Sequence, residues 1–340
     1  MAKINAAIIG ISGYTGIEAL RILLNHKHVN ILNLAANANA NKDISEIYPA
    51  FSGYNLPKII KFEEVDFTNI DVAFFCLPHG TSQSTIIQVY NQHKHVKIID
   101  LSADFRLKSV GDYQKWYGLP HLSDEIQQSD VAYGLPEFYR TEIKQKRIIA
   151  CPGCYPTSAI LPLKPLIENN LISKQSIIID SKSGLTGSGR KETVSNLFSE
   201  RNETATAYGL FSHRHNSELI QELGSDVNFI FTPHVIPINR GIISTIYAKK
   251  TDIPQNIQTF LSDFYKNEPF IEVLDFIPQT KDVSGTNRCR IYTQSKNDNL
   301  IIVSAIDNLC KGSSGQAVQN MNIAFGFDEI EGLNFAPIFP

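Results

Sequence analysis

A cysteine that follows a proline and a glycine is the first candidate for chemistry in this sequence. Cys154 stands in Cys-Pro-Gly-Cys-Tyr-Pro-Thr-Ser and precedes the apolar run 159–163, which predicts that it lies in the first turn of a helix. Unpaired N–H groups at a helix N-terminus favour a thiolate over a thiol. Because a thiolate attacks acyl carbons, we predict that Cys154 is a nucleophile.

A second cysteine leaves another interpretation open. Cys151 precedes Cys154 by three residues, and a C-x-x-C pair is typical of thiol-redox proteins. The chain has five cysteines, an odd number spread over 340 residues, which does not indicate a secreted disulfide framework. A redox pair would require both thiols, whereas an acyl-transfer nucleophile requires only Cys154.

Two histidines are the candidates for an acid or base beside the sulfur. His213 and His215 occur in the polar segment Ser-His-Arg-His-Asn, and covalent catalysis requires such a group near the nucleophile. The sequence does not distinguish between them, and a pair of solvated surface histidines is the alternative. We find no cluster of Cys, His and carboxylates at the spacing of a metal site, so we expect no metal.

A glycine-rich turn near the N-terminus is typical of nucleotide binding. Gly10, Gly13 and Gly16 form G-x-x-G-x-x-G between a strand predicted over 4–10 and a helix predicted over 16–25. Such a turn brings backbone N–H groups and a helix N-terminus against a pyrophosphate. On its own the pattern also fits an ordinary strand-to-helix turn, but its place at the first βα junction favours a cofactor.

The end of the second predicted strand indicates which dinucleotide is bound. NAD enzymes usually carry a carboxylate there for the ribose hydroxyls. This chain has Ala36, Asn37, Ala38 and Asn39, and Lys42 is the nearest cation. NADP, with its 2′-phosphate, is therefore favoured.

The elements around these residues predict two domains. Short apolar runs alternate with helical patterns in the first third, which is typical of an α/β, Rossmann-type doubly wound parallel sheet. Longer β-branched runs after residue 148 predict a second, α+β domain with a mixed, largely antiparallel sheet. We expect residues 1–148 and about 307–340 to form the first domain, with the helix over 312–325 packed on it, and residues 149–306 the second. The individual strands are predicted over 4–10, 29–36, 71–77, 96–101, 176–181, 228–235, 241–249 and 300–306.

Composition excludes several classes of partner. A formal net charge of −3 without a run of Lys and Arg indicates no nucleic-acid partner. No stretch approaches eighteen consecutive apolar residues, so we expect no membrane span. The N-terminal apolar run is too short for a signal peptide, and a cytoplasmic location is expected.

The motifs together resemble one family, the N-acetyl-gamma-glutamyl-phosphate reductases, in the wider group that includes aspartate-semialdehyde dehydrogenase. They span nearly the whole chain in the family's order. The matching segments are GISGYTG (10–16), LPHG (77–80), DLSADFR (100–106), YGLPE (133–137), PGCYPT (152–157), SKSGLTGSGR (181–190), HRH (213–215), PHVIP (233–237) and DNLCKGSSGQAVQNMN (307–322).

The resemblance implies the third step of arginine biosynthesis, in which NADPH reduces N-acetyl-glutamyl 5-phosphate to the semialdehyde and releases inorganic phosphate. Cys154 would carry the acyl group as a thioester, and His213 or His215 would move the proton. The resemblance also implies a homodimer or homotetramer built on the second domain's sheet. The same chemistry on an N-succinyl-glutamyl or aminoadipyl phosphate stays open, and so does a non-catalytic NADP-binding regulator.

The same resemblance assigns binding residues. The expected cofactor contacts are Gly10, Ser12, Gly13, Tyr14, Thr15 and Gly16 at the pyrophosphate, and Pro78, His79, Gly80 and Asn308 at the nicotinamide. The expected substrate contacts are Arg106, Ser183, Gly184 and Arg190, since guanidinium forks match carboxylate and phosphate geometry.

Two departures from the family pattern matter. Cys151 replaces the family's usual Asn before Pro-Gly-Cys, which makes a reversible Cys151–Cys154 disulfide a hypothesis. The Asn-Ala-Asn segment at 37–39 replaces the more usual Ser or Thr with Arg. This second departure leaves the strength of the NADP preference open.

Overall fold

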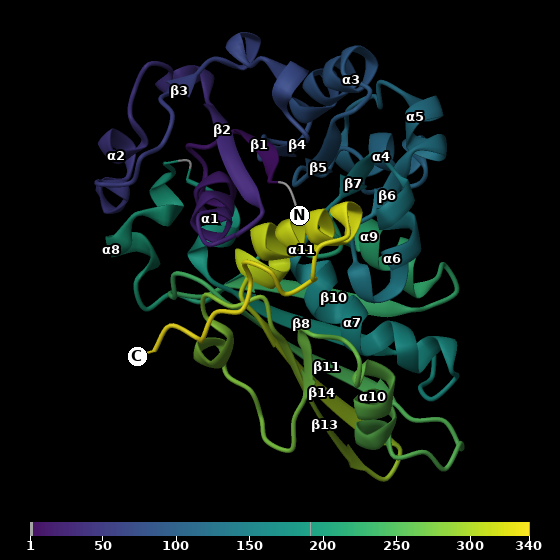
Figure 1. Ribbon diagram of the computed structural model, residues 1–340. Coiled ribbons are helices and arrows are strands. Elements are labelled where there is room, and N and C mark those ends of the chain that lie inside the picture. The colour runs from purple at the N-terminus through teal and green to yellow at the C-terminus, as the bar shows by residue number, and fades with distance from the viewer. Residues whose placement is uncertain (1–2, 191, 340) are drawn as a thin grey trace. The chain divides into compact units, whose positions relative to one another are not determined.

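The computed structural model (Figure 1) describes residues 3–190 and 192–339. The chain forms two compact units, of which unit 1 comprises Met1–Pro152 and Ser314–Leu333, and unit 2 comprises Gly153–Ser313 and Asn334–Pro340. The sequence placed the divisions at 148/149 and about 306/307, with both ends of the chain in the first domain. The structure divides a few residues later and returns the last segment to unit 2.

Unit 1 is built on a seven-stranded sheet in the order β3-β2-β1-β4-β5-β7-β6, with every neighbouring pair parallel. Its strands are short apolar runs buried on both faces, as parallel sheets require. The strands are β1 (Ile4–Ile9), β2 (Val29–Ala35), β3 (Ile59–Ile60), β4 (Val72–Phe75), β5 (Lys97–Asp100), β6 (Val131–Tyr133) and β7 (Ile148–Ala150).

Helices and short turns connect these strands. The helix predicted over 312–325 is observed as α11 (Gly315–Phe325) and belongs to unit 1, where it packs against α1, α6 and β5. The helices of unit 1 are α1 (Tyr14–Leu23), α2 (Ile44–Ile47), α3 (Ser82–Gln92), α4 (Val110–Tyr117), α5 (Asp124–Ser129), α6 (Pro136–Gln145) and α11. Its 3-10 turns are η1 (Asn37–Asn39), η2 (Pro49–Phe51), η3 (Phe62–Glu64) and η4 (Phe67–Asn69).

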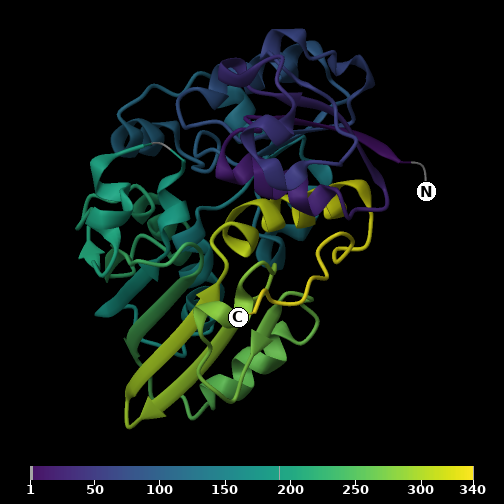
Figure 2. The same cartoon turned by 90° about the vertical axis from the view of Figure 1, so that its left-hand side faces the viewer.

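Unit 2 contains the mixed sheet that the sequence predicted, in the order β12-β13-β14-β11-β8-β10-β9. The pairs β8/β10 and β12/β13 are parallel and the other pairs antiparallel. Figure 2 shows β13 and β14 as a long yellow-green hairpin. The strands are β8 (Ile177–Ser183), β9 (Thr206–Ala207), β10 (Phe229–Val235), β11 (Ile242–Lys249), β12 (Ile271–Val273), β13 (Cys289–Lys296) and β14 (Asn299–Ile306).

The two faces of this sheet differ. Helices α7 and α10 pack on one face, where alternate residues such as Ile177 and Ile179 are fully buried. On the other face, one large side chain from each of β8, β10, β11 and β14 stays 41–44% exposed. We call these four residues the apolar sheet face: Ile178, Ile230, Tyr247 and Ile301.

The helices of unit 2 are α7 (Cys154–Glu168), α8 (Phe198–Arg201), α9 (Asn216–Leu223) and α10 (Ile257–Tyr265). Its shorter turns are η5 (Leu185–Ser188), η6 (Val194–Asn196), η7 (Thr280–Val283) and a π turn over Cys310–Ser314.

No helix within residues 3–190 and 192–339 combines the length and the apolar composition needed to cross a membrane.

Candidate active site

Cys154 is the first residue of α7, as the sequence predicted. Gly153 caps this helix in an extended conformation. Pro156 fits the first turn, because the N–H groups of that turn have no acceptor within the helix and the N–H that proline lacks is not needed there. Cys154 keeps partial solvent access, unlike the buried residues that follow it. A Cβ atom on Gly312 would lie 2.8 Å from Cys154 Cβ, so the π turn passes directly against Cys154.

His215 and Glu218 lie beside the first turn of α7. A Cβ on Gly153 would lie 2.5 Å from His215 Nε2 and 2.9 Å from Glu218 Oε1. The Gly153 N–H donates to Glu218 Oε2 at 2.9 Å, and Glu218 Oε1 is 3.9 Å from His215 Nε2. Glu218 is fully buried. The structure thus places an imidazole and a carboxylate next to the residue that precedes Cys154.

His213 has a different environment. Its ring contacts those of Tyr155, Tyr208, Phe231 and His215 at centroid distances of 4.7–5.7 Å. Burial, together with the charge of neighbouring Arg214, lowers the pKa of His213 to about 4. Its Nδ1 accepts the backbone N–H of His215 at 3.1 Å, which places the proton of the neutral ring on Nε2. His213 is therefore neutral near pH 7 and packs behind His215.

Two tyrosines complete this cluster, and the sequence did not assign them a role. Tyr155 donates its hydroxyl to the carbonyl of His234 at 2.8 Å, and the Tyr208 hydroxyl donates to the Tyr155 oxygen at 3.3 Å. Burial raises the pKa of both phenols, and the charge of Cys154 adds to this effect. Sequence reasoning also missed Glu218, although its spacing of three residues from His215 in a helical pattern was a usable signal.

Three predicted binding residues of unit 2 lie together. A Cβ on Gly187 would lie 3.1 Å from Ser183 Oγ and 4.0 Å from Asn308 Nδ2. Asn308 fastens this segment, because its Oδ1 accepts the Gly241 N–H at 2.6 Å and its Nδ2 donates to Thr186 Oγ1 at 2.9 Å. Gly184 begins the same segment, and its N–H donates to the carbonyl of Gly241 at 2.9 Å. Arg190 lies further along the same segment, and its side chain is exposed.

The remaining predicted substrate contact, Arg106, belongs to unit 1. Its side chain is buried, with Nε donating to the carbonyl of Cys151 at 2.7 Å and Nη2 to that of Leu101 at 3.3 Å. At least two of its donors therefore bind backbone of unit 1. Any contact of Arg106 with substrate would have to use guanidinium N–H groups other than the two that make these bonds.

The glycine turn of unit 1 has the form of a dinucleotide cradle. Gly10 has φ +89°, and a Cβ there would lie 2.4 Å from the carbonyl oxygen of Cys76. A Cβ on Gly16 would lie 2.5 Å from the Gly10 oxygen. Gly13 caps α1, so Tyr14 and Thr15 stand in its first turn. A tight turn that only glycine fits, directly before a helix N-terminus, is the arrangement that binds a pyrophosphate in dinucleotide folds.

The segment after β2 supplies neutral and basic groups. Asn37–Asn39 form the 3-10 turn η1, none of whose residues is buried, and Lys42 Nζ donates to Asn39 Oδ1 at 3.4 Å. Asn37 Oδ1 accepts the Phe62 N–H at 3.0 Å. No carboxylate stands within Ala36–Lys42, so this segment fits a 2′-phosphate better than a pair of ribose hydroxyls.

The predicted nicotinamide segment, Pro78–Gly80, is held by a buried carboxylate. Both oxygens of Asp104 accept the Gly80 N–H, at 2.8 and 2.9 Å. Asp104 also accepts the Gln83 N–H at 3.1 Å and the Tyr113 hydroxyl at 2.6 Å. Gly80 has φ +80°, a conformation that favours glycine.

Cys151 is a buried thiol of unit 1. Its backbone N–H donates to the carbonyl of Asp100 at 2.8 Å, extending the β5/β7 ladder, and its Sγ accepts from Asn320 Nδ2 at 3.6 Å. Burial raises the pKa of Cys151 to about 12. Such a thiol is a poor redox partner, and no disulfide joins any of the five cysteines, all of which lie in the described part of the chain.

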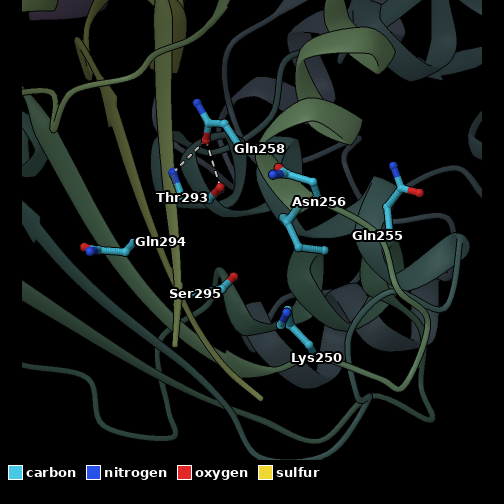
Figure 3. A pocket seen from close by; sticks show the side chains of 8 residues that line it. Lys250, Gln255, Asn256, Gln258, Thr293, Gln294 and Ser295 are labelled. Carbon is cyan, nitrogen blue, oxygen red and sulfur yellow. Dashed lines mark hydrogen bonds between the residues drawn. The ribbon is translucent and has the colours of Figure 1, made fainter. Parts of the chain in front are cut away.

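A polar hollow at the far end of the mixed sheet lies apart from this cluster within unit 2 (Figure 3). Residues from the start of α10 and from the end of β13 line it, with Gln258 accepting from the N–H and hydroxyl of Thr293. None of the predicted site residues contributes to its wall.

A Rossmann unit combined with a mixed-sheet unit whose first helix begins at a cysteine defines an oxidoreductase of the semialdehyde dehydrogenase class. Residues 5–146 match the family model for the semialdehyde dehydrogenase NAD binding domain, and residues 154–308 match that for the semialdehyde dehydrogenase dimerisation domain. Aspartate semialdehyde dehydrogenase II from Vibrio cholerae has a similar structure, with a TM-score of 0.72, 15% identity, and coverage of 96% of this chain and 99% of that one. The enzyme from Candida albicans, solved with NADP, has a TM-score of 0.70, 16% identity, and coverage of 95% and 98%.

Sequence relatives narrow the class. N-acetyl-gamma-glutamyl-phosphate reductase from Vesicomyosocius okutanii is 44% identical, covering 99% of this chain and 100% of its own length. The Paracoccus denitrificans enzyme of that name is also 44% identical, with 99% of each chain covered. A probable chloroplastic one from Arabidopsis thaliana is 42% identical over 99% of this chain and 86% of its own. The chain belongs to the N-acetyl-gamma-glutamyl-phosphate reductase family.

This membership confirms the family, the fold class, the oxidoreductase class and the NAD(P)-binding domain that the sequence predicted. The roles of individual residues stay predictions.

Proposed function

We propose that the chain catalyses the NADPH-dependent reduction of N-acetyl-glutamyl 5-phosphate to N-acetyl-glutamate 5-semialdehyde and inorganic phosphate, as a biosynthetic step towards arginine. The observation that carries the proposal is the cluster at Gly153. An imidazole and a carboxylate meet there, next to a cysteine at a helix N-terminus. This arrangement suits a thiolate nucleophile with a proton carrier and a group that orients the carrier.

The chemistry follows from these residues. The Cys154 thiolate attacks the acyl carbon, and phosphate leaves as the C–S bond forms, which gives a thioester. When bound, NADPH supplies the hydride that reduces this thioester. The oxyanion left by the reduction takes a proton from water, which gives the thiohemiacetal. His215 then takes this hydroxyl proton as the C–S bond breaks, which releases the aldehyde and regenerates the thiolate, and His215 returns the proton to water. Glu218 orients the His215 ring and stabilises its protonated form.

We assign the proton transfer to His215 and not to His213. Burial keeps His213 neutral, whereas the Glu218 carboxylate stands 3.9 Å from His215. His213 then acts as a packed support whose Nδ1 holds the backbone of His215. This assignment chooses between two histidines that the sequence left equivalent.

The glycine turn and the segments Pro78–Gly80 and Ala36–Lys42 would hold NADPH, with Asn308 at the nicotinamide. Substrate anions would be held by Arg106, Ser183, Gly184 and Arg190. The apolar sheet face supports a homodimer or homotetramer, because four large side chains stay 41–44% exposed there on consecutive strands. A cytoplasmic location stays a prediction from the sequence.

A phosphate-dependent assay in the reverse direction tests the proposal. N-acetyl-glutamate semialdehyde, phosphate and NADP should give NADPH, and Cys154→Ala should abolish this. Undiminished activity in that variant would refute the thioester. Parallel assays with N-succinyl and aminoadipyl semialdehydes identify the acyl group. A chain that binds NADPH but converts none of the three aldehydes would be a regulator.

A further inference from the structure

A fully buried carboxylate anchors the segment that passes against the nucleophile. Asp307 accepts two hydrogen bonds from Arg240, Nε at 2.7 Å and Nη2 at 3.1 Å. It also accepts three backbone N–H groups, from Gly285 at 2.6 Å, Leu309 at 2.8 Å and Cys310 at 3.1 Å. Five donors from three separate segments of unit 2 therefore converge on this one side chain.

The anchored segment continues to the sulfur. The Gly312 N–H donates to the backbone carbonyl of Asp307 at 3.0 Å, which closes the turn that begins at this residue. A side chain on Gly312 would collide with Cys154, so any displacement of this turn alters the packing of the nucleophile. A π turn is an uncommon conformation, often found at functional sites, and here Asp307 supports its start.

The partner of Asp307 holds the other side of the site. A Cβ on Gly184 would lie 2.8 Å from the backbone nitrogen of Arg240 and 2.8 Å from the Asn239 carbonyl oxygen. Thr186 donates its hydroxyl to that same carbonyl at 2.7 Å. The Arg240–Asp307 pair thus joins the strand connection that supports Gly184 to the turn that supports Cys154.

The C-terminal segment packs against the turn at Ser284 and Gly285, which is part of this hydrogen-bond network. The Ile338 N–H donates to the carbonyl of Ser284 at 2.9 Å, and a Cβ on Gly285 would lie 2.7 Å from Ile338 Cδ1. Gly285 is the residue whose N–H forms the shortest bond to Asp307. Unit 2 includes this end of the chain, and Ile338 packs on the turn that holds Asp307.

We propose that Asp307, through its ion pair with Arg240 and with the brace from the C-terminal segment, is a positioning residue for Cys154. The inference rests on the proposed function, in which Cys154 is the nucleophile. In this assignment Asp307 and Arg240 act through the turn and not on the reacting carbon. They keep the turn around Gly312 packed against Cys154. The Cys154 sulfur then stays within the favourable electrostatic field at the N-terminus of α7.

The variant Arg240→Gln tests this, since removing Asp307 itself would leave buried donors unpaired and unfold the unit. The matched control is Arg290→Gln. Arg290 binds Glu272 at the same 2.7 Å, and both arginine side chains are 21% exposed. We expect Arg240→Gln to lower kcat about ten- to a hundredfold, with KM for NADP changed less than about twofold. Arg240→Lys should recover part of the loss.

Thiol reactivity gives a readout independent of turnover. Iodoacetamide labelling of Cys154, followed by peptide mass spectrometry, should be at least about threefold slower at pH 7 in Arg240→Gln, with a higher pH midpoint. The same rate and midpoint as in Arg290→Gln would overturn the proposal. If wild type labels as expected but reduces no acyl phosphate, the proposed function fails while the positioning role stands.

Deletion of residues 334–340 tests the brace. We expect a three- to tenfold loss of kcat, less than the roughly hundredfold loss that a misplacement of about 1 Å can cause, and slower labelling of Cys154. NADPH binding, measured by fluorescence titration, should be unchanged. If the deletion lowers thermal stability but leaves kcat and labelling at wild-type values, the C-terminal segment has no positioning role.

Discussion

Glu218 accepts the backbone N–H of Gly153 at 2.9 Å, and this bond joins the N-terminus of α7 to α9. The two residues are 65 positions apart in the sequence. The bond fixes the carboxylate at the residue before the nucleophile, where its second oxygen faces His215. A buried acid in this place orients the imidazole and offsets the charge that the ring gains on protonation.

The variant Glu218→Gln should lower kcat about tenfold, because an amide can still accept the Gly153 N–H but cannot stabilise a protonated imidazole. The acidic limb of the kcat/KM profile should move to lower pH, since the ring then protonates less readily. Steady-state assays from pH 5 to 9 measure both effects. Glu222→Gln is the control on the same helix, where the acid pairs with Lys164. An unshifted acidic limb would contradict the role of Glu218.

Substitutions of His213 and of His215 should change the pH profile of activity in different ways. Burial lowers the pKa of His213 to about 4, so this ring is already neutral throughout pH 6–8 and its replacement removes no titration there. His213→Asn should keep the shape of the profile, whereas His215→Asn should lose its acidic limb and about a hundredfold in kcat. The opposite pattern would make His213 the proton carrier.

Cys151 should not control the oxidant sensitivity of the enzyme. Its pKa is raised to about 12 by burial, so almost no thiolate is present at pH 7 to react. Cys151→Ser should lose activity to hydrogen peroxide at a rate within about twofold of wild type, since oxidation follows the thiolate of Cys154. Marked protection in Cys151→Ser would instead support the Cys151–Cys154 disulfide.

Local patterns were sufficient to predict much of this fold. The glycine turn, the start of the helix at Cys154 and most long strands depend on residues that are neighbours in sequence. The strand predicted over 228–235 is observed at Phe229–Val235, and the one over 241–249 at Ile242–Lys249. Periodicity and turn residues carry this information because hydrogen bonds within an element are short-range.

Contacts between distant segments could not be predicted in the same way. Asp307 lies in unit 2, where Arg240, 67 residues earlier, binds it, and Ile338 near the end of the chain binds Ser284 of the same unit. Tyr208 contacts Tyr155, 53 residues away, through its hydroxyl. Neither pairing leaves a periodic signal in one sequence.

Asp100 should make unit 1 less stable as pH rises. Burial, reinforced by the nearby charge of Asp104, raises its pKa to about 6, so the folded chain binds this proton more tightly than the unfolded chain does. Stability is then lost between about pH 4 and 6 and stays lower above that range. Asp100→Asn should raise the free energy of unfolding at pH 8 by up to about 2–3 kcal/mol and change it little at pH 4. Urea titration monitored by the fluorescence of Trp116, the single tryptophan, reports on the unfolding of this unit. An equal change in the free energy of unfolding at both pH values would contradict the argument.

Lys42 should contribute to the preference for NADPH over NADH. It is the nearest cation after β2, its ammonium lies by Asn39, and no carboxylate stands between Ala36 and Lys42 to repel a 2′-phosphate. Lys42→Ala should raise KM for NADPH about two- to fivefold and leave KM for NADH unchanged, because exposed ion pairs are worth at most about 1 kcal/mol. Lys58→Ala, which removes another cation of unit 1, is the control for net charge. The effect should fade at high salt, since screening weakens the attraction to the phosphate. An equal rise in KM for both cofactors would place Lys42 at the pyrophosphate or adenine and not at the 2′-phosphate.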